Sequence, residues 1–168
     1  MELRELRLGD LDFYERIHTD PAMWAELGGP RPREGIAAKL ERDVRSMQSD
    51  RDWIFVIVPD PVKGTPAGTV PLWEHEWRGA AINEIGWMVL PEFQGRGLAK
   101  AAVTAALARA KAAGRFDPVN AFPATTNAPS NGICKALGFE LLGEVEYSSP
   151  SAALRCNHWR LRLATFPP

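Results

Sequence analysis

The sequence of this protein reads NEIGWMVL at residues 83–90, PEFQGRG at 91–97 and LAKAAVTAALARAKAA at 98–113. The first segment is short, apolar and aromatic, which is typical of a strand. The third segment is rich in strong helix formers and stops at Gly114, so it predicts a helix. The turn between them is basic and glycine-rich. Because a helix N-terminus offers unpaired N–H groups, and glycine lets an anion approach the backbone, this arrangement predicts a phosphate-binding site.

Two common phosphate-binding patterns fit this turn poorly. A P-loop requires G-x-x-x-x-G-K-[ST], which this turn does not supply. The dinucleotide fingerprint G-x-G-x-x-G matches only at Gly95 and Gly97, because Lys100 stands at the third glycine position. Residues 91–94 also separate the turn from the strand. An ordinary strand–turn–helix connection is the plainer alternative to either nucleotide site.

Another pattern fits better. Residues 94–99 read QGRGLA, which matches [QR]-x-x-G-x-[GA], and a second motif, N-x-x-S followed by LGF, is present at Asn127, Ser130 and 137–139. Together these motifs resemble those of the GNAT superfamily of acyl-CoA-dependent N-acetyltransferases. The second motif resembles the Rim-type branch, named for enzymes that acetylate ribosomal-protein N-termini. The resemblance is firm over about residues 67–139, and the order of elements extends it to the whole chain.

The resemblance implies an α/β (α+β) GNAT fold. Its sheet is mixed and mostly antiparallel, splayed between the fourth and fifth strands, and flanked by helices. The sequence itself predicts strands near 3–8, 53–58, 67–76, 83–90, 118–122, 139–147 and 154–163, with helices at 10–19, 33–49, 98–113 and 130–137. Residues 20–32 are expected to form an irregular loop with one short helical piece. Most strands are joined by turns too short for crossovers, so only the pair across the central helix should be parallel.

Length and composition predict a single domain over residues 1–168. The chain is 45% hydrophobic with a formal net charge of −1, so no bulk electrostatic argument favours nucleic acid or an anionic membrane as partner. The first residues form no apolar run, which argues against a signal peptide or membrane helix. Two cysteines without metal-type spacing indicate a reduced, cytoplasmic protein. The oligomeric state is open, and a homodimer is compatible with the sequence.

The resemblance implies that acetyl-CoA is the cofactor. It assigns Met88 and Val89 to the pantetheine arm, and the N–H group of one of these two to the thioester carbonyl, without deciding which. It assigns the pyrophosphate to the backbone of Gln94, Gly95, Arg96, Gly97, Leu98, Ala99 and Lys100. The side chains of Arg96 and Lys100 either add positive charge there or are solvated surface groups. Asn127 is expected to bind the pantetheine arm.

Glu84 is the first candidate for the general base that deprotonates the acceptor amine. It lies four residues before Met88 on the same strand face, and Rim-type sequences often carry a glutamate there. If the preceding hairpin turn centres near Gly79, Glu84 pairs with Glu74, and two facing carboxylates raise one another's pKa. A one-residue change in register would separate them. His75 is expected to lie at the surface or in the core.

The acid that protonates the leaving thiolate is a tyrosine in many GNAT enzymes, and here Cys134 stands at that position. The resemblance to Rim-type members assigns the role to Ser130 instead. Asn127 and Ser130 are also good helix-capping residues, so a capping role stays open beside the catalytic one. Cys134 is expected to lie mid-helix and buried, which would raise its pKa and make it a poor nucleophile. Direct acetyl transfer in a ternary complex is therefore expected.

The resemblance places one wall of the acceptor pocket on the first two helices and their connection. Trp24 and Leu27 are candidate substrate contacts there, although packing of a loop onto the core explains them equally well. The six tryptophans and the group Glu74, Glu76 and Glu84 suggest an aromatic, somewhat acidic pocket suited to a cationic amine. The resemblance implies that the acceptor is a primary amine on a small molecule or at a peptide N-terminus, with Glu74 as a further candidate substrate contact. The alternative function is a non-catalytic acyl-CoA-binding module that acts as sensor or scaffold. Glu84 and Ser130 argue against it.

Overall fold

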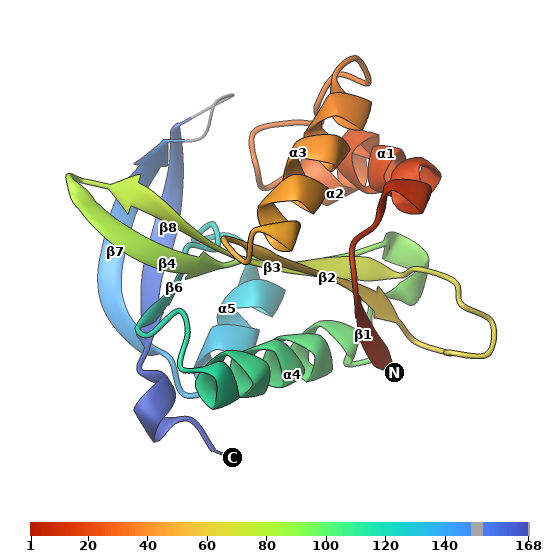
Figure 1. Ribbon diagram of the computed structural model, residues 1–168. Helices are drawn as coiled ribbons and strands as arrows, with labels where there is room; N and C mark the ends of the chain where they lie inside the picture. The colour runs from red at the N-terminus through yellow and green to blue at the C-terminus, as the bar shows by residue number, and fades with distance from the viewer. Residues whose placement is uncertain (149–152, 168) are drawn as a thin grey trace.

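The structure is a computed structural model that describes residues 1–148 and 153–167, and it shows one mixed sheet with helices on both faces (Figure 1). The described strands are β1 (Glu2–Glu5), β2 (Trp53–Val58), β3 (Gly68–Trp77), β4 (Ala80–Ile85), β5 (Met88–Val89), β6 (Val119–Ala121), β7 (Glu140–Ser148) and β8 (Ala153–Leu161). The α-helices are α1 (Leu11–Thr19), α2 (Pro21–Trp24), α3 (Ile36–Gln48), α4 (Leu98–Ala113) and α5 (Ala128–Ala136). The predicted order of strands and helices is confirmed, but the strand expected at 83–90 is divided into β4 and β5, and the strand expected at 3–8 ends at Glu5.

The strands are arranged in the order β1-β2-β3-β4-β6-β8-β7, and β5 pairs with β3. The pair β4–β6, which α4 connects, is parallel, and the other strand pairs are antiparallel. The ladder between β4 and β6 consists of Asn83 opposite Val119 and Glu84 opposite Asn120. Beyond β4 the chain continues as β5, which still pairs with β3 but no longer pairs with β6. The predicted fourth strand, 83–90, corresponds to β4 and β5, and the predicted fifth strand, 118–122, corresponds to β6. The predicted splay between these two strands is confirmed.

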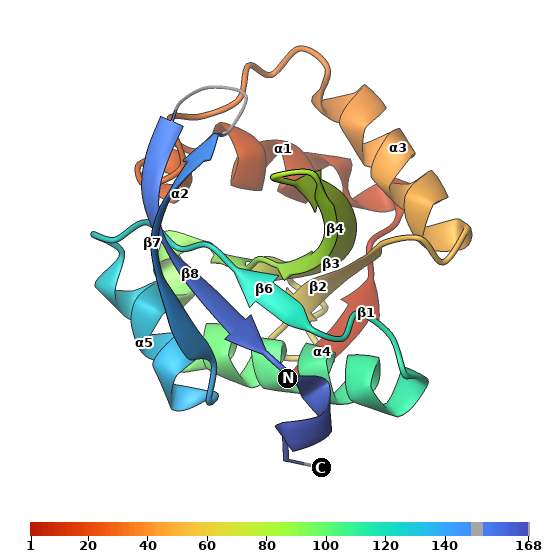
Figure 2. The ribbon, with the colours of Figure 1, turned by 90° about the vertical axis from the view of Figure 1, so that its left-hand side faces the viewer.

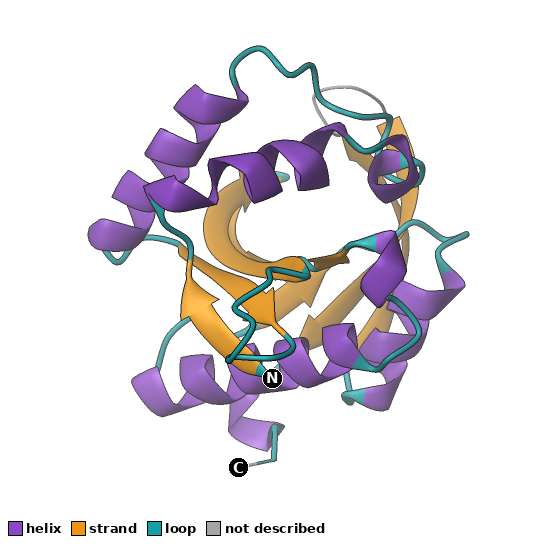
Figure 3. Cartoon of the chain, turned by 90° about the vertical axis from the view of Figure 1, so that its right-hand side faces the viewer, coloured by secondary structure: helices purple, strands orange, loops and turns teal. Residues whose placement is uncertain are grey.

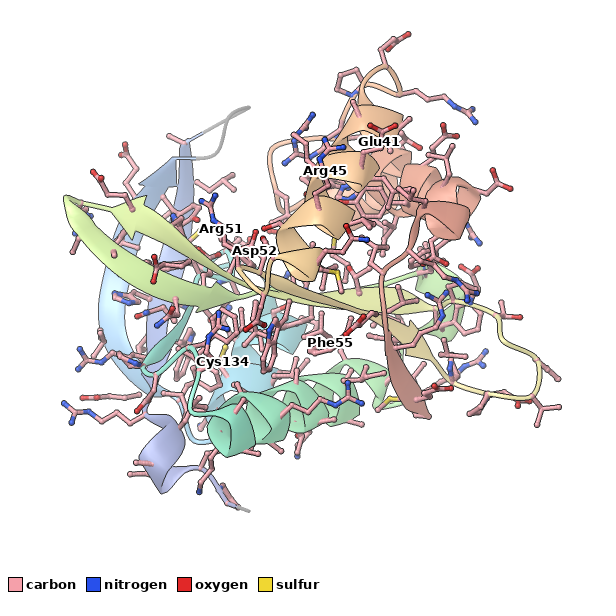
Figure 4. All side chains as sticks on the ribbon, in the orientation of Figure 1. Glu41, Arg45, Arg51, Asp52, Phe55 and Cys134 are labelled. Atoms are coloured by element: carbon pink, nitrogen blue, oxygen red, sulfur yellow. The ribbon has the colours of Figure 1, made fainter. Side chains whose placement is uncertain are left out.

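Two helical layers cover the sheet. Figures 2 and 3 show α1, α2 and α3 on one face, with α4 and α5 on the other. Strand β2 contributes to both cores, because successive side chains of a strand point to opposite faces. Ile54 and Val56 belong to the cluster with α1 and α3, whereas Phe55 and Ile57 belong to the cluster with α4. Figure 4 shows Phe55 between the sheet and α4. Burial on both faces explains why β2 is a continuous apolar run.

Helix α4 lies against the sheet through small side chains. Ala102, Ala106 and Ala110 follow one another at four-residue spacing and are each 0% exposed. Such a row lets the helix backbone approach the strands closely, so larger side chains there would force the layers apart. The helix ends at Gly114, which adopts a left-handed conformation with φ 64°.

Two local predictions at helix starts are corrected. Helix α3 begins at Ile36 rather than Arg33, because Gly35 precedes it with φ 90°, outside the helical region. The Asp10 side chain does not cap α1. Its carboxylate instead lies 2.6 Å from the Arg4 guanidinium and accepts a hydrogen bond from the Arg7 N–H. An ion pair with the preceding strand therefore replaces the expected cap.

The register of the β3–β4 hairpin differs from the predicted one by one residue. The loop consists of Arg78 and Gly79, which both have positive φ, 52° and 79°. Two such residues form the tight loop typical of hairpins, so the turn centres between them rather than on Gly79. Trp73 therefore lies opposite Glu84, and Glu74 lies opposite Asn83 on the other face. The predicted pairing of Glu74 with Glu84 is wrong.

Candidate active site

The divergence of β5 from β6 is accompanied by a cleft of about 1190 Å³. Hydrogen bonds hold the β5 segment on β3: the Gly86 N–H donates to the Pro71 carbonyl at 3.0 Å, and the Leu90 N–H donates to the Ala67 carbonyl at 2.8 Å. Gly68 is needed for this approach, since a Cβ there would lie 2.1 Å from the Met88 carbonyl oxygen. The glycine on β3 thus lets β5 leave the β4–β6 ladder.

Most of the predicted site residues lie around this one cleft. Its lining includes Trp24, Leu27, Glu84, Met88, Val89, Gln94, Gly95, Gly97, Leu98, Ala99, Lys100, Asn127 and Ser130. Glu74 is exposed on the opposite face of β3 and is not among the lining residues. Arg96 is not among them either. Its guanidinium donates to the Glu92 carbonyl and lies 5.6 Å from the centre of the Phe93 ring.

The basic turn presents its backbone to the cleft. Gly95 and Gly97 have φ 72° and 71°, a conformation that glycine adopts without strain. Gly97 is the N-cap of α4 and has no side chain to occupy the first-turn N–H groups. Among the described residues, no acceptor is bonded to the N–H groups of residues 95–100. The Gln94 side chain donates to the Val89 carbonyl at 2.8 Å and so ties the turn to β5. These free N–H groups at a helix N-terminus fit a pyrophosphate.

The second predicted motif forms the N-terminus of α5. Asn127 is the N-cap, and its side-chain oxygen accepts the Ser130 N–H at 3.0 Å. The capping interpretation is therefore confirmed for Asn127. Ser130 is the third helical residue and receives this cap instead of providing it, and both residues line the cleft.

Cys134 lies on α5, one turn beyond Ser130. It is 0% exposed, and Figure 4 places it between the sheet and the helical layer formed by α4 and α5. Burial raises the pKa of its thiol to about 12. The thiol is thus protonated at neutral pH, as the sequence predicted, and it does not suit a nucleophilic role.

Glu84 of β4 is a buried carboxyl group that side chains of β3 and β7 hold in place. Only 7% of the residue is exposed. Its Oε2 lies 2.8 Å from the His75 Nε2 of β3, and it accepts the Tyr147 hydroxyl of β7, also at 2.8 Å. Glu84 and Asn120 form the last residue pair of the β4–β6 ladder, and Glu84 lines the cleft that opens beyond it.

The surroundings of Glu84 shift its protonation in a direction useful for a base. Burial raises its pKa above the ordinary value of a glutamate, and the hydrogen bonds from His75 and Tyr147 oppose that rise. The bond to Glu84 in turn raises the pKa of His75. Tyr147 remains a hydrogen-bond donor, because burial and the neighbouring carboxylate raise its pKa. The net shift, a raised pKa, makes the carboxylate a stronger base than an exposed glutamate.

Sequence reasoning missed His75 and Tyr147 as partners of Glu84. His75 was placed at the surface or in the core because the hairpin register was one residue off. The Arg78-Gly79 pair carried the signal, since two-residue hairpin loops favour glycine in their second position. Tyr147 lies 63 residues beyond Glu84 and reaches it through the sheet order β4-β6-β8-β7. No local sequence pattern predicts that contact.

At the other end of the cleft, α1, α2 and α3 contribute an aromatic and charged wall. Trp24 and Leu27 both line the cleft, as expected for acceptor contacts. Trp24 also serves as packing, because it is 9% exposed and its indole N–H donates to the Ile17 carbonyl at 2.9 Å. Tyr14, His18, Arg31, Lys39 and Asp43 join it in the lining.

Neither a metal centre nor a membrane span is found in the part of the chain that the structure describes. No group of three or more His, Cys, Asp or Glu side chains there is arranged to hold a metal ion. No helix among the described residues is both long and apolar enough to cross a bilayer.

Comparison with known proteins supports the resemblance seen in the motifs. Residues 1–140 match the acetyltransferase (GNAT) domain family. No curated protein sequence matches the chain. Many solved structures are similar, and three of them describe enzymes with different acceptors.

The first of these structures is the ribosomal-protein-S5-alanine acetyltransferase from Vibrio fischeri, with a TM-score of 0.81 and 20% identity over 99% of this chain and 94% of that one. Spermidine N-acetyltransferase from Vibrio cholerae, in complex with CoA and spermine, has a TM-score of 0.79 and 18% identity, covering 97% and 95%. The Salmonella typhimurium enzyme that modifies the N-terminal serine of ribosomal protein L7/L12 has a TM-score of 0.77 and 15% identity, covering 95% and 93%. At these identities the structures establish a shared fold.

The family match covers most of the chain, and the cleft has the features that the family's cofactor needs. The chain therefore belongs to the GNAT family of acetyltransferases and is an N-acetyltransferase that uses acetyl-CoA.

Proposed function

We propose that this enzyme transfers the acetyl group of acetyl-CoA directly to a primary amine, within a ternary complex. The strongest support is Glu84, a buried carboxyl at the opening of the cleft with a raised pKa and two hydrogen-bonding partners. A general base must be able to take a proton near working pH and must be held in position. The pKa of Glu84 is raised toward that range, and His75 and Tyr147 hold the carboxyl in position.

Acetyl-CoA supplies the acetyl group as a thioester and leaves as CoA. Glu84 accepts the proton that the attacking amine loses, while His75 and Tyr147 keep the carboxyl in place. The N–H groups at residues 95–100 hold the pyrophosphate, and Asn127 binds the pantetheine arm at the N-terminus of α5.

We assign the N–H group that polarises the thioester carbonyl to Val89. The N–H groups of Gly86 and Leu90 both donate to β3. In an antiparallel ladder the N–H groups of alternate residues point to the same neighbour, so that of Met88 is also directed at β3. The N–H of Val89 is then directed to the splayed side, where it can stabilise negative charge on the carbonyl oxygen.

Ser130 is the proposed proton donor to the departing CoA thiolate. Its N–H is already occupied by the Asn127 cap, and the residue lines the cleft. The hydroxyl gives its proton to the thiolate and recovers one from solvent, while Glu84 releases its proton to solvent. Buried Cys134 takes no part in this exchange.

The acceptor is proposed to be a primary amine on a small molecule or at a peptide N-terminus. The solved relatives include enzymes named for spermidine and for ribosomal-protein N-termini, and both kinds of acceptor present such an amine. Trp24 and Leu27 would contact it at the far end of the cleft. Two buried free thiols are consistent with a cytoplasmic location, which we also propose.

The test is a pair of measurements on the purified protein. Acetyl-CoA should raise the melting temperature, because a ligand that binds only the folded state stabilises it by mass action. Release of CoA thiol should then depend on an added amine from a panel of small amines and peptides. Binding of acetyl-CoA without transfer to any member of a broad panel would favour a non-catalytic sensor instead.

A further inference from the structure

The acceptor end of the cleft contains an aromatic wall with one arginine fixed to it. The rings of Tyr14, His18 and Trp24 lie side by side, with centroids 4.3 Å apart for the first pair and 5.5 Å for the second. The guanidinium carbon of Arg31 lies 5.0 Å from the centre of the Trp24 ring. The Arg31 N–H also donates to the His18 carbonyl at 3.0 Å. Arg31 is thus held over the wall by both its backbone and its side chain.

The two cations at this end differ in their partners. Lys39 is neutralised inside the protein, since its Nζ lies 2.6 Å from Asp43 Oδ2 and 2.7 Å from the Tyr14 hydroxyl. Arg31 has no ion pair or side-chain hydrogen bond with any residue that the structure describes, and its buried Nε lacks an acceptor. A half-buried cation without an anion is costly. Arg31 therefore lacks a counter-ion among the described residues.

The carboxylates in the lining bind other side chains, and none of them forms an ion pair with Arg31 in the part of the chain that the structure describes. Asp43 binds Lys39 and Tyr14, Glu26 accepts from the Thr126 hydroxyl, and Glu84 binds His75 and Tyr147. Asp52 lies at the start of β2, near the end of α3 (Figure 4). One of its oxygens accepts from the Ser46 hydroxyl at 2.5 Å, and the other has no partner among the described residues.

His18 is an uncharged member of the aromatic wall beside Arg31. It is 9% exposed, and burial, with Lys39 and Arg31 nearby, lowers its pKa to about 3. A histidine with so low a pKa is neutral at physiological pH, so it neither adds to the positive charge nor provides an anion. Of the wall residues Tyr14, His18, Trp24 and Arg31, it is Arg31 that presents a charge without an ion-pair partner among the described residues, and this charge disfavours a second positive group beside it.

We propose that the acceptor of this enzyme carries a carboxylate besides its amine, and that Arg31 binds that carboxylate. This deepens the proposed function and rests on it. A guanidinium matches the two oxygens of a carboxylate, which gives orientation as well as affinity. The amine would then extend along the cleft toward Glu84. A polyamine would place a second cation against Arg31, so the pocket selects against it.

Binding can be measured without acetyl transfer by saturating the protein with CoA and titrating acceptors in a calorimeter. The small probes are β-alanine and γ-aminobutyrate, each beside its carboxamide. The peptide probes are C-terminally amidated tripeptides that begin with Asp or with Asn. Spermidine completes the set. The small and peptide arms distinguish a free amino acid from an acidic protein N-terminus.

In at least one arm the carboxylate member should bind roughly 10- to 100-fold more tightly than its amide, as expected for hydrogen bonds between charged groups. Arg31→Gln should abolish that preference, and Arg31→Lys should weaken it while keeping its direction. Arg33→Gln is the matched control. The Arg33 side chain is 77% exposed, pairs with Glu15 and does not line the cleft, so the preference should remain.

Three results would overturn the proposal: equal binding of acid and amide in both arms, tighter binding of spermidine than of any acid, or no binding of any probe. An unchanged preference in both Arg31 variants would overturn it as well. Because no acetyl group is transferred, these results are independent of catalysis. Transfer to neutral amines without any acid preference would leave the proposed function standing and reject this inference alone.

Discussion

The proposed cofactor side and the proposed catalytic side of the cleft are built in different ways. The turn proposed to bind the pyrophosphate is one continuous segment, residues 94–100, whose shape follows from its own glycines and from the helix that begins there. The proposed catalytic group combines Glu84 of β4 with His75 of β3 and with Tyr147 of β7, which lies 63 residues beyond Glu84. The turn can be identified from local sequence, whereas the catalytic group depends on strand register and strand order.

The two regions should also differ in their sensitivity to side-chain substitution. The turn exposes backbone N–H groups, which are present whatever the side chains are. Its function therefore depends mainly on the backbone conformation. The catalytic group depends on three particular side-chain atoms and on burial, so loss of a single oxygen or nitrogen should change its chemistry without unfolding the protein. The following variants test that contrast, in order of decreasing effect.

The largest effect is expected for Glu84→Gln. The amide cannot accept a proton from the amine, so turnover should fall about 10²- to 10⁴-fold. The melting-temperature increase caused by acetyl-CoA should persist, because the turn is untouched. Glu76→Gln is the control, since Glu76 is exposed on the opposite face of the same hairpin. Steady-state kinetics and thermal shift on both variants check this, and wild-type turnover in Glu84→Gln would remove Glu84 from the mechanism.

The next effect is expected for Gly97→Val. Gly97 has φ 71°, and a β-branched residue is strained there even though no atom blocks its Cβ. The strain should reorient the free N–H groups and remove most of the acetyl-CoA-dependent increase in melting temperature.

Gly114→Val provides the matched comparison at the other end of α4. Gly114 has φ 64° and open space around its Cβ, so it should lose a similar amount of stability, about 1–2 kcal/mol. Its response to acetyl-CoA should stay normal. Equal responses of the two variants to acetyl-CoA would mean that the turn does not bind the cofactor.

A smaller effect is expected for Tyr147→Phe. The hydroxyl stabilises the ionised form of Glu84 and thereby lowers its pKa. Without it the pKa of Glu84 should rise further, so the acidic limb of the rate profile should move to higher pH and the rate at neutral pH should fall several-fold. A pH profile of kcat/KM measures this directly. A uniform loss of rate at every pH, with no movement of the limb, would assign Tyr147 a packing role only.

The smallest effect is expected for the two residues of α5. Ser130→Ala should slow turnover a few-fold, because the thiolate leaves without a proton donor, and the melting temperature should hardly change since Asn127 provides the cap. Cys134→Ala should keep most activity and lose stability, because it removes a fully buried side chain. Rates and melting temperatures of both variants separate the two roles. An acetylated Cys134 detected by mass spectrometry would contradict direct transfer.

Much of the fold could be predicted because local signals agree with it. Gly114 marks the end of α4, the apolar run of β2 reflects burial on two faces, and the short connections require antiparallel neighbours. The residues that the two motifs predict for cofactor binding lie around one cleft, and of the seven residues of the turn only Arg96 is not part of the lining.

The remaining parts of the site depend on relations that a linear sequence does not fix. A one-residue change in the β3–β4 register exchanged Glu74 for His75 as the neighbour of Glu84. The approach of Tyr147 depends on β7 and β8 folding back beside β6. The position of Arg31 could not be predicted either, because the loop after α2 brings it over Trp24 only in the folded protein. The same holds for the ion pair between Lys39 and Asp43.

The most direct test of the account is the pH dependence of acetyl transfer in the wild type and in Glu84→Gln, at saturating acetyl-CoA and amine. Burial raises the pKa of Glu84, and a base works only when deprotonated, so the wild-type rate should rise with pH through that raised pKa and then level off. In Glu84→Gln this limb should disappear, and the remaining rate should increase only where the amine itself deprotonates. The same limb in both proteins would show that another group is the base and would contradict the account.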